Sequence, residues 1–353
     1  MKMLTFLIMA GGSGERFWPL STKKKPKQLL KIFDNKSLIR LTYERILPLA
    51  ETGQIFIATN EIQVAALKEE LPELEDSRII IEPAFRDTAS AIAYGSMMIS
   101  KYYENPTICV LASDHLISDE ESFRNTIKIA YKEAQVNKIV TLGIQPSYPE
   151  TGYGYIKVDK AVLNEPVQSL GFTEKPNYEK ALEYYQSGKY LWNSGMFIFK
   201  YSVIMAALKK YSENHYNIIC EISKKIRENN GGITAYEIKE LFLNFEKKSI
   251  DFAVMEKADN ICVIPSSFGW NDVGSFLAFE KLFDKDENLN VINNAAVISV
   301  DSKNNIIVST GNNQRISLLG VENMIVVITE NEILFSQKEK CQDIKKIIKK
   351  IYT

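Results

Sequence analysis

The stretch LTFLIMAGGSGERFWPLSTKKKPKQLL, residues 4–30, gives the strongest indication of how this chain folds. It opens with an apolar run that is typical of a buried strand and passes at once into a loop with three glycines. Such a loop suits an anion, because backbone N–H groups approach phosphate oxygens closely where no Cβ intervenes. A Walker A loop is excluded because no lysine directly follows the last glycine. The dinucleotide fingerprint is excluded because Phe17 stands at its third glycine position.

Within this loop, Gly11, Gly12 and Gly14 supply open backbone, and Arg16 and Lys27 supply positive charge. These cations suit a polyphosphate, since arginine and lysine form charge-assisted hydrogen bonds with phosphate oxygens. On these residues alone, a glycine-rich turn with solvated lysines is an equal alternative.

Beyond the loop, short β-rich runs alternate with helical patterns as far as about residue 145. This alternation favours an α/β fold, with helices around a doubly wound, mostly parallel, Rossmann-like sheet. The predicted strands are residues 4–10, 54–59, 78–84, 107–113 and 138–144, continued by 152–158, 167–175 and 195–200. The predicted helix N-caps are Ser37, Asn60, Asp87 or Thr88, and Ser118, whose spacing from Glu121 matches a capping box.

The pattern changes after about residue 285. Residues 289–335 consist mainly of short β-branched runs separated by Asn, Asp and Gly, which is typical of strands joined by tight turns. We therefore predict two domains, an α/β domain over residues 1–285 and a small all-β, β-helix-like domain with a terminal helix over residues 286–353.

The terminal segment, residues 339–353, alternates isoleucines and lysines at helical spacing. Its isoleucines share one face of the predicted helix, with lysines opposite: Ile344, Ile347, Ile348 and Ile351. A basic amphipathic helix of this kind either lies on a membrane or docks on its own protein, and docking is the favoured interpretation.

Composition narrows the class of protein. The 353 residues carry 43 basic and 44 acidic side chains, so no overall field favours nucleic acid or membrane partners. The four cysteines form no C-x-x-C pair, which disfavours zinc and disulfide frameworks. The apolar N-terminal run is too short for a signal peptide or a membrane span, so a cytoplasmic location is expected.

At this point the sequence blocks resemble a known family. Residues 7–30 closely resemble the signature of the nucleotidyltransferases that make nucleoside diphosphate sugars, and the whole chain resembles the mannose-1-phosphate guanylyltransferases among them. The resemblance continues in order through EPAFRDTASAIA (82–93), LASDHLI (111–117), PETGYGYI (149–156), FTEKP (172–176), LWNSGMFIF (191–199), SIDFAVMEK (249–257) and GWNDVGS (269–275). It implies a nucleotidyltransferase, GT-A-like sheet.

The implied reaction is attack by a sugar 1-phosphate oxygen on the α-phosphorus of a nucleoside triphosphate. That oxygen is already ionised at neutral pH, so no general base is required and catalysis must come from alignment and charge neutralisation. The family's metal aspartates match Asp114, at the end of an apolar strand, and Asp272, in a turn before a helix, and they imply Mg²⁺. An ordinary N-cap is the alternative for both. The resemblance gives Arg16 and Lys27 to the triphosphate.

The resemblance also implies the remaining contacts. Lys175 corresponds to the lysine that grips the sugar phosphate, and Gly154, Glu174 and Asn193 correspond to the sugar site. The implied nucleotide-binding residues are Ala10, Gly11, Gly12, Ser13, Gly14, Arg16, Lys27, Glu82, Asp87 and Thr88.

Other residues depart from the family pattern or are given supporting roles. Relatives usually carry asparagine in place of Asp87 and often glycine in place of Phe85. SIDFAVMEK is interpreted as a mostly structural helix face, and His115 as an orienting group. Phe17 and Trp18 are expected to anchor the loop to the core.

The expected substrates are therefore GTP and mannose 1-phosphate, with no nucleic acid or membrane partner, and a homodimer is plausible from relatives. The mannose epimer comes from resemblance alone. A nucleotidyltransferase for another hexose or heptose 1-phosphate and a catalytically silent nucleotide-sugar sensor remain alternatives. Many relatives carry a further cupin-type isomerase domain, which is not expected here, so the chain is predicted to be monofunctional.

Overall fold

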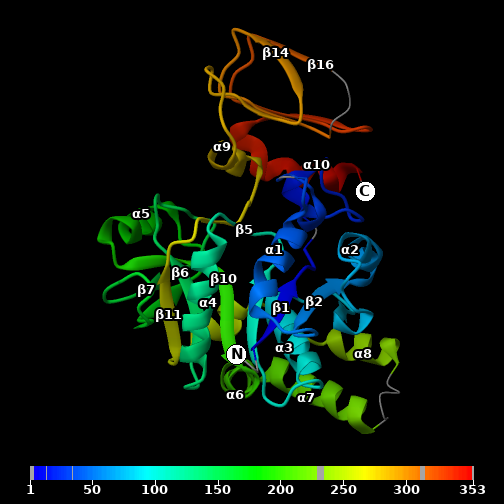
Figure 1. Cartoon of the computed structure of the whole chain (residues 1–353), viewed down its shortest axis with the longest axis vertical. Coiled ribbons are helices and arrows are strands. Elements are labelled where there is room, and N and C mark those ends of the chain that lie inside the picture. The colour runs from blue at the N-terminus through cyan, green and yellow to red at the C-terminus, as the bar shows by residue number, and fades with distance from the viewer. Residues whose placement is uncertain (1–3, 13, 34, 229–233, 311–314, 352–353) are drawn as a thin grey trace.

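The computed structural model describes residues 4–12, 14–33, 35–228, 234–310 and 315–351. A ten-stranded sheet with helices on both faces forms the larger part of the molecule, and a smaller body of strands lies at one end of it (Figure 1). The predicted α/β fold class with an all-β appendage is confirmed.

The main sheet is mostly parallel and follows the order β3-β2-β1-β4-β10-β6-β11-β8, with β7 and β9 attached through β10. Its strands are β1 (Leu4–Met9), β2 (Ile55–Asn60), β3 (Ile79–Glu82), β4 (Thr107–Ala112), β6 (Ile139–Ile144), β7 (Tyr155–Lys157), β8 (Val167–Gln168), β9 (Gly171–Thr173), β10 (Tyr190–Lys200) and β11 (Ile261–Ser266). The long β10 runs antiparallel between β4 and β6. Strand β11 was not among the predicted strands, because periodicity alone does not distinguish a short, continuously apolar run from a buried helix segment.

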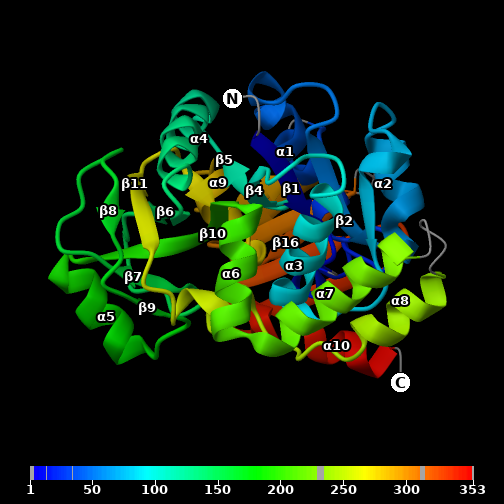
Figure 2. The same cartoon turned by 90° about the horizontal axis from the view of Figure 1, so that it is seen from below.

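Alternate residues of β1 face two separate apolar layers, as a doubly wound sheet requires. Phe6 and Ile8 pack in one cluster with α1 (Leu38–Ile46) and α4 (Glu120–Ala134). Leu7 packs in the other cluster with α3 (Asp87–Ile99), α6 (Tyr201–Tyr211) and α7 (Glu213–Glu228). Figure 2 shows these two groups of helices on opposite sides of the sheet. The helices of this part are α1 (Leu38–Ile46), α2 (Val64–Glu70), α3 (Asp87–Ile99), α4 (Glu120–Ala134), α5 (Tyr178–Ser187), α6 (Tyr201–Tyr211), α7 (Glu213–Glu228), α8 (Ala235–Phe242) and α9 (Phe279–Leu282).

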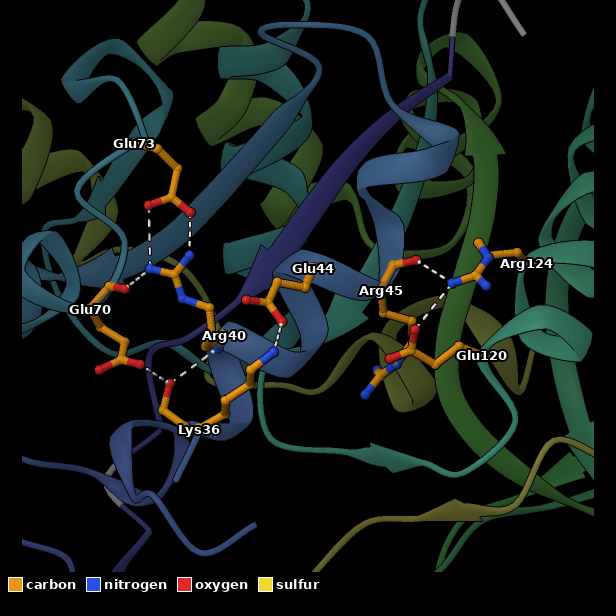
Figure 3. A network of polar contacts seen from close by, with 9 residues as sticks. Lys36, Arg40, Glu44, Arg45, Glu70, Glu73, Glu120 and Arg124 are labelled. Atoms are coloured by element: carbon orange, nitrogen blue, oxygen red, sulfur yellow. Dashed lines mark hydrogen bonds and ion pairs between the residues drawn. The ribbon is translucent and has the colours of Figure 1, made fainter. Parts of the chain in front are cut away.

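Helix α1 follows the glycine-rich loop and is fixed at both ends (Figure 3). Ser37 is its N-cap, as predicted, and accepts a hydrogen bond from the Arg40 N–H at 3.1 Å. The Arg40 guanidinium bonds the Glu73 carboxylate, which ties the helix to the segment after α2. At the other end, Arg45 donates to the backbone carbonyl of His115 at 3.4 Å. The helix therefore links the loop after β1 to the turn after β4.

The predicted N-caps of two other helices are wrong. Helix α4 is capped by Asp119, which accepts from the Ser122 N–H at 2.9 Å, because both the N–H and the hydroxyl of Ser118 are bonded to the Gly269 carbonyl. Helix α3 begins at Asp87 itself, with Arg86 at the N-cap position and no side-chain cap. Long-range pairing has replaced the local cap in the first case.

The smaller body is a coil of mostly parallel strands. The residues Val291, Ile306 and Ile325 stand in register on successive strands, and β14 pairs in parallel with β16. Inside the turns, the buried Asn305 side chain bonds the Asn290 side chain and the Val321 carbonyl. The strands are β13 (Val291–Asn293), β14 (Ala296–Val300), β15 (Ile306–Ser309), β16 (Arg315–Leu319), β17 (Met324–Ile328) and β18 (Ile333–Gln337).

The terminal helix α10 (Ile344–Ile351) docks on the protein. Ile344 is buried and Ile348 is partly buried in a cluster that also contains Phe17 and Trp18. Ile347 and Ile351 remain 38% and 47% exposed, so only part of the predicted apolar face is used. Among the residues that the structure describes, no helix has both the length and the apolarity to cross a membrane.

Candidate active site

The glycine-rich loop leaves the carboxyl end of β1 and turns into a short 3₁₀ helix, η1 (Glu15–Phe17). Gly14 adopts a φ of +64°, and a Cβ built on it would lie 2.4 Å from the Lys27 Cβ. Only glycine therefore allows the loop to fold back onto Lys27. Ser13, a predicted nucleotide contact, lies outside the described residues.

Three buried polar side chains hold the inner edge of this loop. The Gln28 amide donates to the carbonyls of Ala10 at 2.8 Å and Gly12 at 3.2 Å. Thr59 donates to the same Ala10 carbonyl, and Gln63 to that of Gly12. Within the described part of the chain, no acceptor is bonded to the N–H groups of Gly11 and Gly12. The carbonyls of Ala10 and Gly12 thus accept hydrogen bonds from the protein, whereas the N–H groups of Gly11 and Gly12 are available to bind an anion.

A cavity of about 370 Å³ lies in front of the loop and brings together four predicted catalytic residues. It is lined by Gly14, Glu15, Arg16, Phe17, Lys27, Asp114, His115, Asp272, Gly274 and Lys345. Lys27 is buried and its ammonium bonds the Asp114 carboxylate at 2.8 Å and the Asp272 backbone carbonyl at 2.6 Å. Arg16, by contrast, is exposed. The cavity therefore combines a buried cation that is paired with a carboxylate, Lys27, and an exposed cation, Arg16.

The two aspartates of this cavity are held in different ways. Burial favours the neutral form of Asp114, but the Lys27 ammonium and the neighbouring His115 hold the pKa of Asp114 below its usual range. The Asp272 carboxylate accepts a hydrogen bond from the Tyr153 hydroxyl at 2.7 Å. Burial and the Asp272 charge raise the pKa of Tyr153, so this hydroxyl remains a donor. Both carboxylates are therefore suited to meet positive charge.

These two carboxylates also fit a divalent ion. Mg²⁺ is held by one or two protein carboxylates and completed by phosphate oxygens and water. The ammonium of Lys27 already occupies a cation's position on Asp114. No cluster of three or more His, Cys, Asp or Glu side chains suited to a metal occurs in the described ranges.

His115 is a supporting residue in this arrangement. Its Nδ1 accepts a hydrogen bond from the Trp270 indole at 3.2 Å, and burial lowers the pKa of His115 despite the nearby Asp114 and Asp272 carboxylates. The ring is therefore neutral at pH 7, as expected for an orienting group.

A second group of predicted residues, the sugar-site cluster, consists of Gly154, Glu174, Lys175 and Asn193. The Lys175 ammonium bonds the Glu174 carboxylate at 2.5 Å. A Cβ on Gly154 would lie 2.5 Å from a Glu174 oxygen, so the backbone and this carboxylate approach closely. The Asn193 N–H bonds the Gly154 carbonyl at 2.8 Å.

Asp251 joins this cluster and was missed as a functional residue, since its segment was interpreted as mostly structural. The Asn193 amide donates to its carboxylate at 3.1 Å. Burial raises the pKa of Asp251 to about 6, and the nearby Glu174 carboxylate adds to the rise. A charged residue inside the otherwise apolar run IDFAVM (250–255) was the available signal. The interpretation as a packed face does not hold for Phe252 of this block, which is 45% exposed.

Glu82 lies at a third location. It lines a cavity of about 210 Å³ with Gly11, Ile62 and Phe85, and burial raises its pKa to about 7. No side chain or N–H group in the described ranges donates a hydrogen bond to its carboxylate.

Asp87 and Thr88, predicted beside Glu82, do not line the Glu82 cavity. Asp87 caps the N–H of Thr88 at 2.7 Å, and the Thr88 hydroxyl accepts from the Ile250 N–H at 2.9 Å. This pair therefore contacts the segment that carries Asp251. Tyr153 connects the cavity at the glycine-rich loop with the sugar-site cluster, because it bonds Asp272 and immediately precedes Gly154.

Comparison with known proteins identifies the family of this chain. A family model for nucleotidyl transferases matches residues 5–288, and a model described as the MannoseP isomerase/GMP-like beta-helix domain matches residues 295–351. The chain is 37% identical over 347 residues to the mannose-1-phosphate guanylyltransferase RfbM of Salmonella typhimurium, covering 97% of this chain and 71% of that protein. It is 35% identical over 355 residues to the alginate biosynthesis protein AlgA of Pseudomonas putida, covering 98% of this chain and 71% of AlgA.

A solved structure is similar over nearly the full length. It is described as a mannose-1-phosphate geranyltransferase from Thermus thermophilus and superposes with a TM-score of 0.88 at 30% identity, covering 99% of this chain and 100% of that one. The similarity therefore includes both the α/β part and the β-helix part.

Proposed function

The chain belongs to the nucleotidyl transferase family, in the group of the mannose-1-phosphate guanylyltransferases, and from this membership we propose that it transfers GMP from GTP to α-D-mannose 1-phosphate. The products are GDP-mannose and pyrophosphate. The observation that carries the proposal is the cavity in which the glycine-rich loop, Arg16, Lys27, Asp114 and Asp272 meet.

The chemistry requires no proton transfer. An oxygen of the sugar phosphate forms a bond to the α-phosphorus of GTP, the bond from that phosphorus to the β-phosphate oxygen breaks, and pyrophosphate leaves with the bonding electrons. The attacking oxygen is ionised at neutral pH, because the second pKa of a phosphate monoester is about 6. The protein must therefore align two anions and neutralise the charge of the leaving group.

The residues divide this work by position. Arg16 and the N–H groups of the loop bind the β- and γ-phosphates, and Lys27 holds Asp114 and the Asp272 backbone in place. Asp114 and Asp272 would hold Mg²⁺. When bound, this ion supplies positive charge to the phosphate oxygens around the reacting phosphorus.

The sugar site uses directional hydrogen bonds. Lys175 binds the phosphate group of the sugar 1-phosphate. The Glu174 carboxylate accepts hydrogen bonds from the sugar hydroxyls, the Asn193 amide also bonds these hydroxyls, and the Gly154 backbone lies beside them. The Glu82 carboxylate suits the N1 and N2 donors of guanine. Thr88 supports the segment that carries Asp251, because its hydroxyl accepts a hydrogen bond from the Ile250 N–H.

A panel of substrates tests the proposal. Purified protein with Mg²⁺ is offered GTP, ATP, UTP and dTTP, each with mannose, glucose, galactose or heptose 1-phosphate, and pyrophosphate release is measured. We expect the highest kcat/KM for GTP with mannose 1-phosphate. A higher value for another pair would identify a different nucleotidyltransferase. Nucleotide-sugar binding without release by folded protein would identify a sensor.

The product also suggests a wider role. AlgA and the xanthan biosynthesis protein XanB of Xanthomonas campestris are named for polysaccharide biosynthesis. We accordingly infer that GDP-mannose from this protein supplies a polysaccharide pathway. A cytoplasmic location and a homodimer stay predictions.

A further inference from the structure

The cavity at the glycine-rich loop has one wall that comes from the C-terminal domain. Lys345, in the first turn of α10, lines it together with Arg16, Lys27 and the two aspartates. All other residues that line it belong to the α/β part. The β-helix domain thus reaches the site where the triphosphate of the proposed reaction is bound.

The backbone around Lys345 is fixed against the loop. The preceding residue, Ile344, is 2% exposed and packs in the same cluster as Phe17, and α10 contacts η1 directly. The preceding turn is held as well, because Lys338 forms an ion pair with Glu280 and a hydrogen bond to the Asn304 side chain at 2.8 Å. Lys345 therefore keeps its place relative to Arg16 through a packed core.

The charges of the cavity favour an anionic ligand for this lysine. Lys27 is occupied by Asp114, and the neighbouring Lys346 is paired with Asp343 at 2.9 Å. Lys345 makes no hydrogen bond or ion pair within the described ranges. Its ammonium does interact electrostatically with the Asp343 carboxylate and helps to lower the pKa of Asp343. Two exposed cations, Arg16 and Lys345, thus line the cavity together with Gly14 of the glycine-rich loop.

We propose that Lys345 binds the β- and γ-phosphates of the nucleotide and the pyrophosphate that leaves, so that the C-terminal domain completes the phosphate site. The inference rests on the proposed function. It deepens that function by adding a cation for the leaving group from outside the signature loop. An exposed ammonium orders on phosphate binding and contributes at the low end of charge-assisted hydrogen bonds.

The test uses the full-length protein with the variants Lys345→Met, Lys345→Arg and the matched control Lys350→Met. Lys350 is an exposed lysine of the same helix that does not line the cavity. The measurements are KM for GTP, KM for mannose 1-phosphate, and the Kd of magnesium pyrophosphate by calorimetry without turnover. Thermal unfolding of each variant confirms that α10 remains docked.

For Lys345→Met we expect KM for GTP and Kd for pyrophosphate to rise about five- to ten-fold. KM for mannose 1-phosphate should change less than two-fold, Lys345→Arg should recover most of the loss, and Lys350→Met should match the unmodified protein. Pyrophosphate binding by Lys345→Met within two-fold of that control would overturn the inference. Inactivity of the unmodified protein toward the substrate panel, with pyrophosphate binding still dependent on Lys345, would overturn the proposed function alone.

Discussion

The electrostatics of Asp114, at the phosphate end of the site, differ from those of Asp251 at the sugar end and Glu82 at the base end. At the phosphate end, Asp114 is paired with the Lys27 ammonium at 2.8 Å, and its pKa is held below the usual range. At the sugar and base ends, Asp251 and Glu82 are bonded by no ammonium or guanidinium group of the described chain, and burial raises their pKa values to about 6 and about 7. The pKa of a carboxyl group is thus lowered at the phosphate end and raised at the sugar and base ends.

This difference matches the ligands that each end is proposed to bind. At the phosphate end, a dication binds to carboxylates and phosphate oxygens bind to cations. This end therefore contains charged side chains of both signs, such as Lys27 and Asp114. The sugar and base ends recognise neutral hydroxyls and N–H groups, for which a buried acceptor oxygen is sufficient. Removing a carboxyl should therefore mainly affect turnover at the phosphate end, affinity for the sugar phosphate at the sugar end, and pH-dependent stability at the base end.

The largest effect is expected at the phosphate end. Asp114→Asn and Asp272→Asn each remove a negative charge that would hold Mg²⁺, and we expect kcat to fall about a thousand-fold. KM for mannose 1-phosphate should change less than about three-fold, because the sugar-site cluster is untouched. Pyrophosphate release at saturating Mg²⁺ measures both constants.

A matched control is available in Asp119, an aspartate that caps α4 away from the cavity. Asp119→Asn should leave turnover unchanged, since asparagine caps nearly as well as aspartate. Near-normal turnover of either cavity variant would remove that aspartate from the proposed metal site, and the comparison between the two ends would lose its basis.

Much of this phosphate end could be predicted from the sequence. Arg16, Lys27 and Asp114 lie in or directly after contiguous motifs whose local geometry, a strand followed by a loop, is readable from residue types. The alternation of patterns likewise predicted the layers of the sheet. Local patterns indicated the strands and turns that carry these residues, and the family resemblance assigned their roles.

Residues that depend on long-range packing could not be predicted in this way. Lys345 resembles any lysine of a basic helix until Ile344 is seen to pack near Phe17. Asp251 contacts Asn193, 58 positions away, and its own segment has the pattern of a buried helix face. Gln28 follows the predicted Lys27 directly, yet only the folded loop shows that it holds two carbonyls.

An intermediate effect is expected at the sugar end, from Asp251. Asp251→Ala leaves the Asn193 amide without its buried acceptor, and we expect KM for mannose 1-phosphate to rise about ten-fold with KM for GTP unchanged. Asp251→Asn keeps an acceptor oxygen in the same place and should cost less than about three-fold. Steady-state kinetics with each substrate varied in turn separates the two constants. Equal losses for both variants would show that the negative charge, and not the hydrogen bond, is what the sugar end requires.

The smallest effect is expected from Glu82 and concerns stability. Its pKa is about 7 in the folded protein and near 4.5 in the unfolded chain, so between these pH values the folded state keeps a proton that the unfolded state has lost. The contribution of Glu82 to the free energy of unfolding therefore falls as pH rises through this window, and the full cost is present above pH 7. Glu82→Gln cannot ionise, so it should be about 1 kcal/mol more stable than the unmodified protein at pH 8 and no more stable at pH 5.

Urea unfolding at pH 5, 6.5 and 8 measures this difference directly. The same variant should raise KM for GTP a few-fold, because an amide matches the two guanine donors less well than a carboxylate does. A stability difference that does not change with pH would mean that Glu82 is not kept neutral by burial. The contrast with Asp114 would then come from Lys27 alone, since a carboxyl at the base end would ionise as freely as one beside a cation.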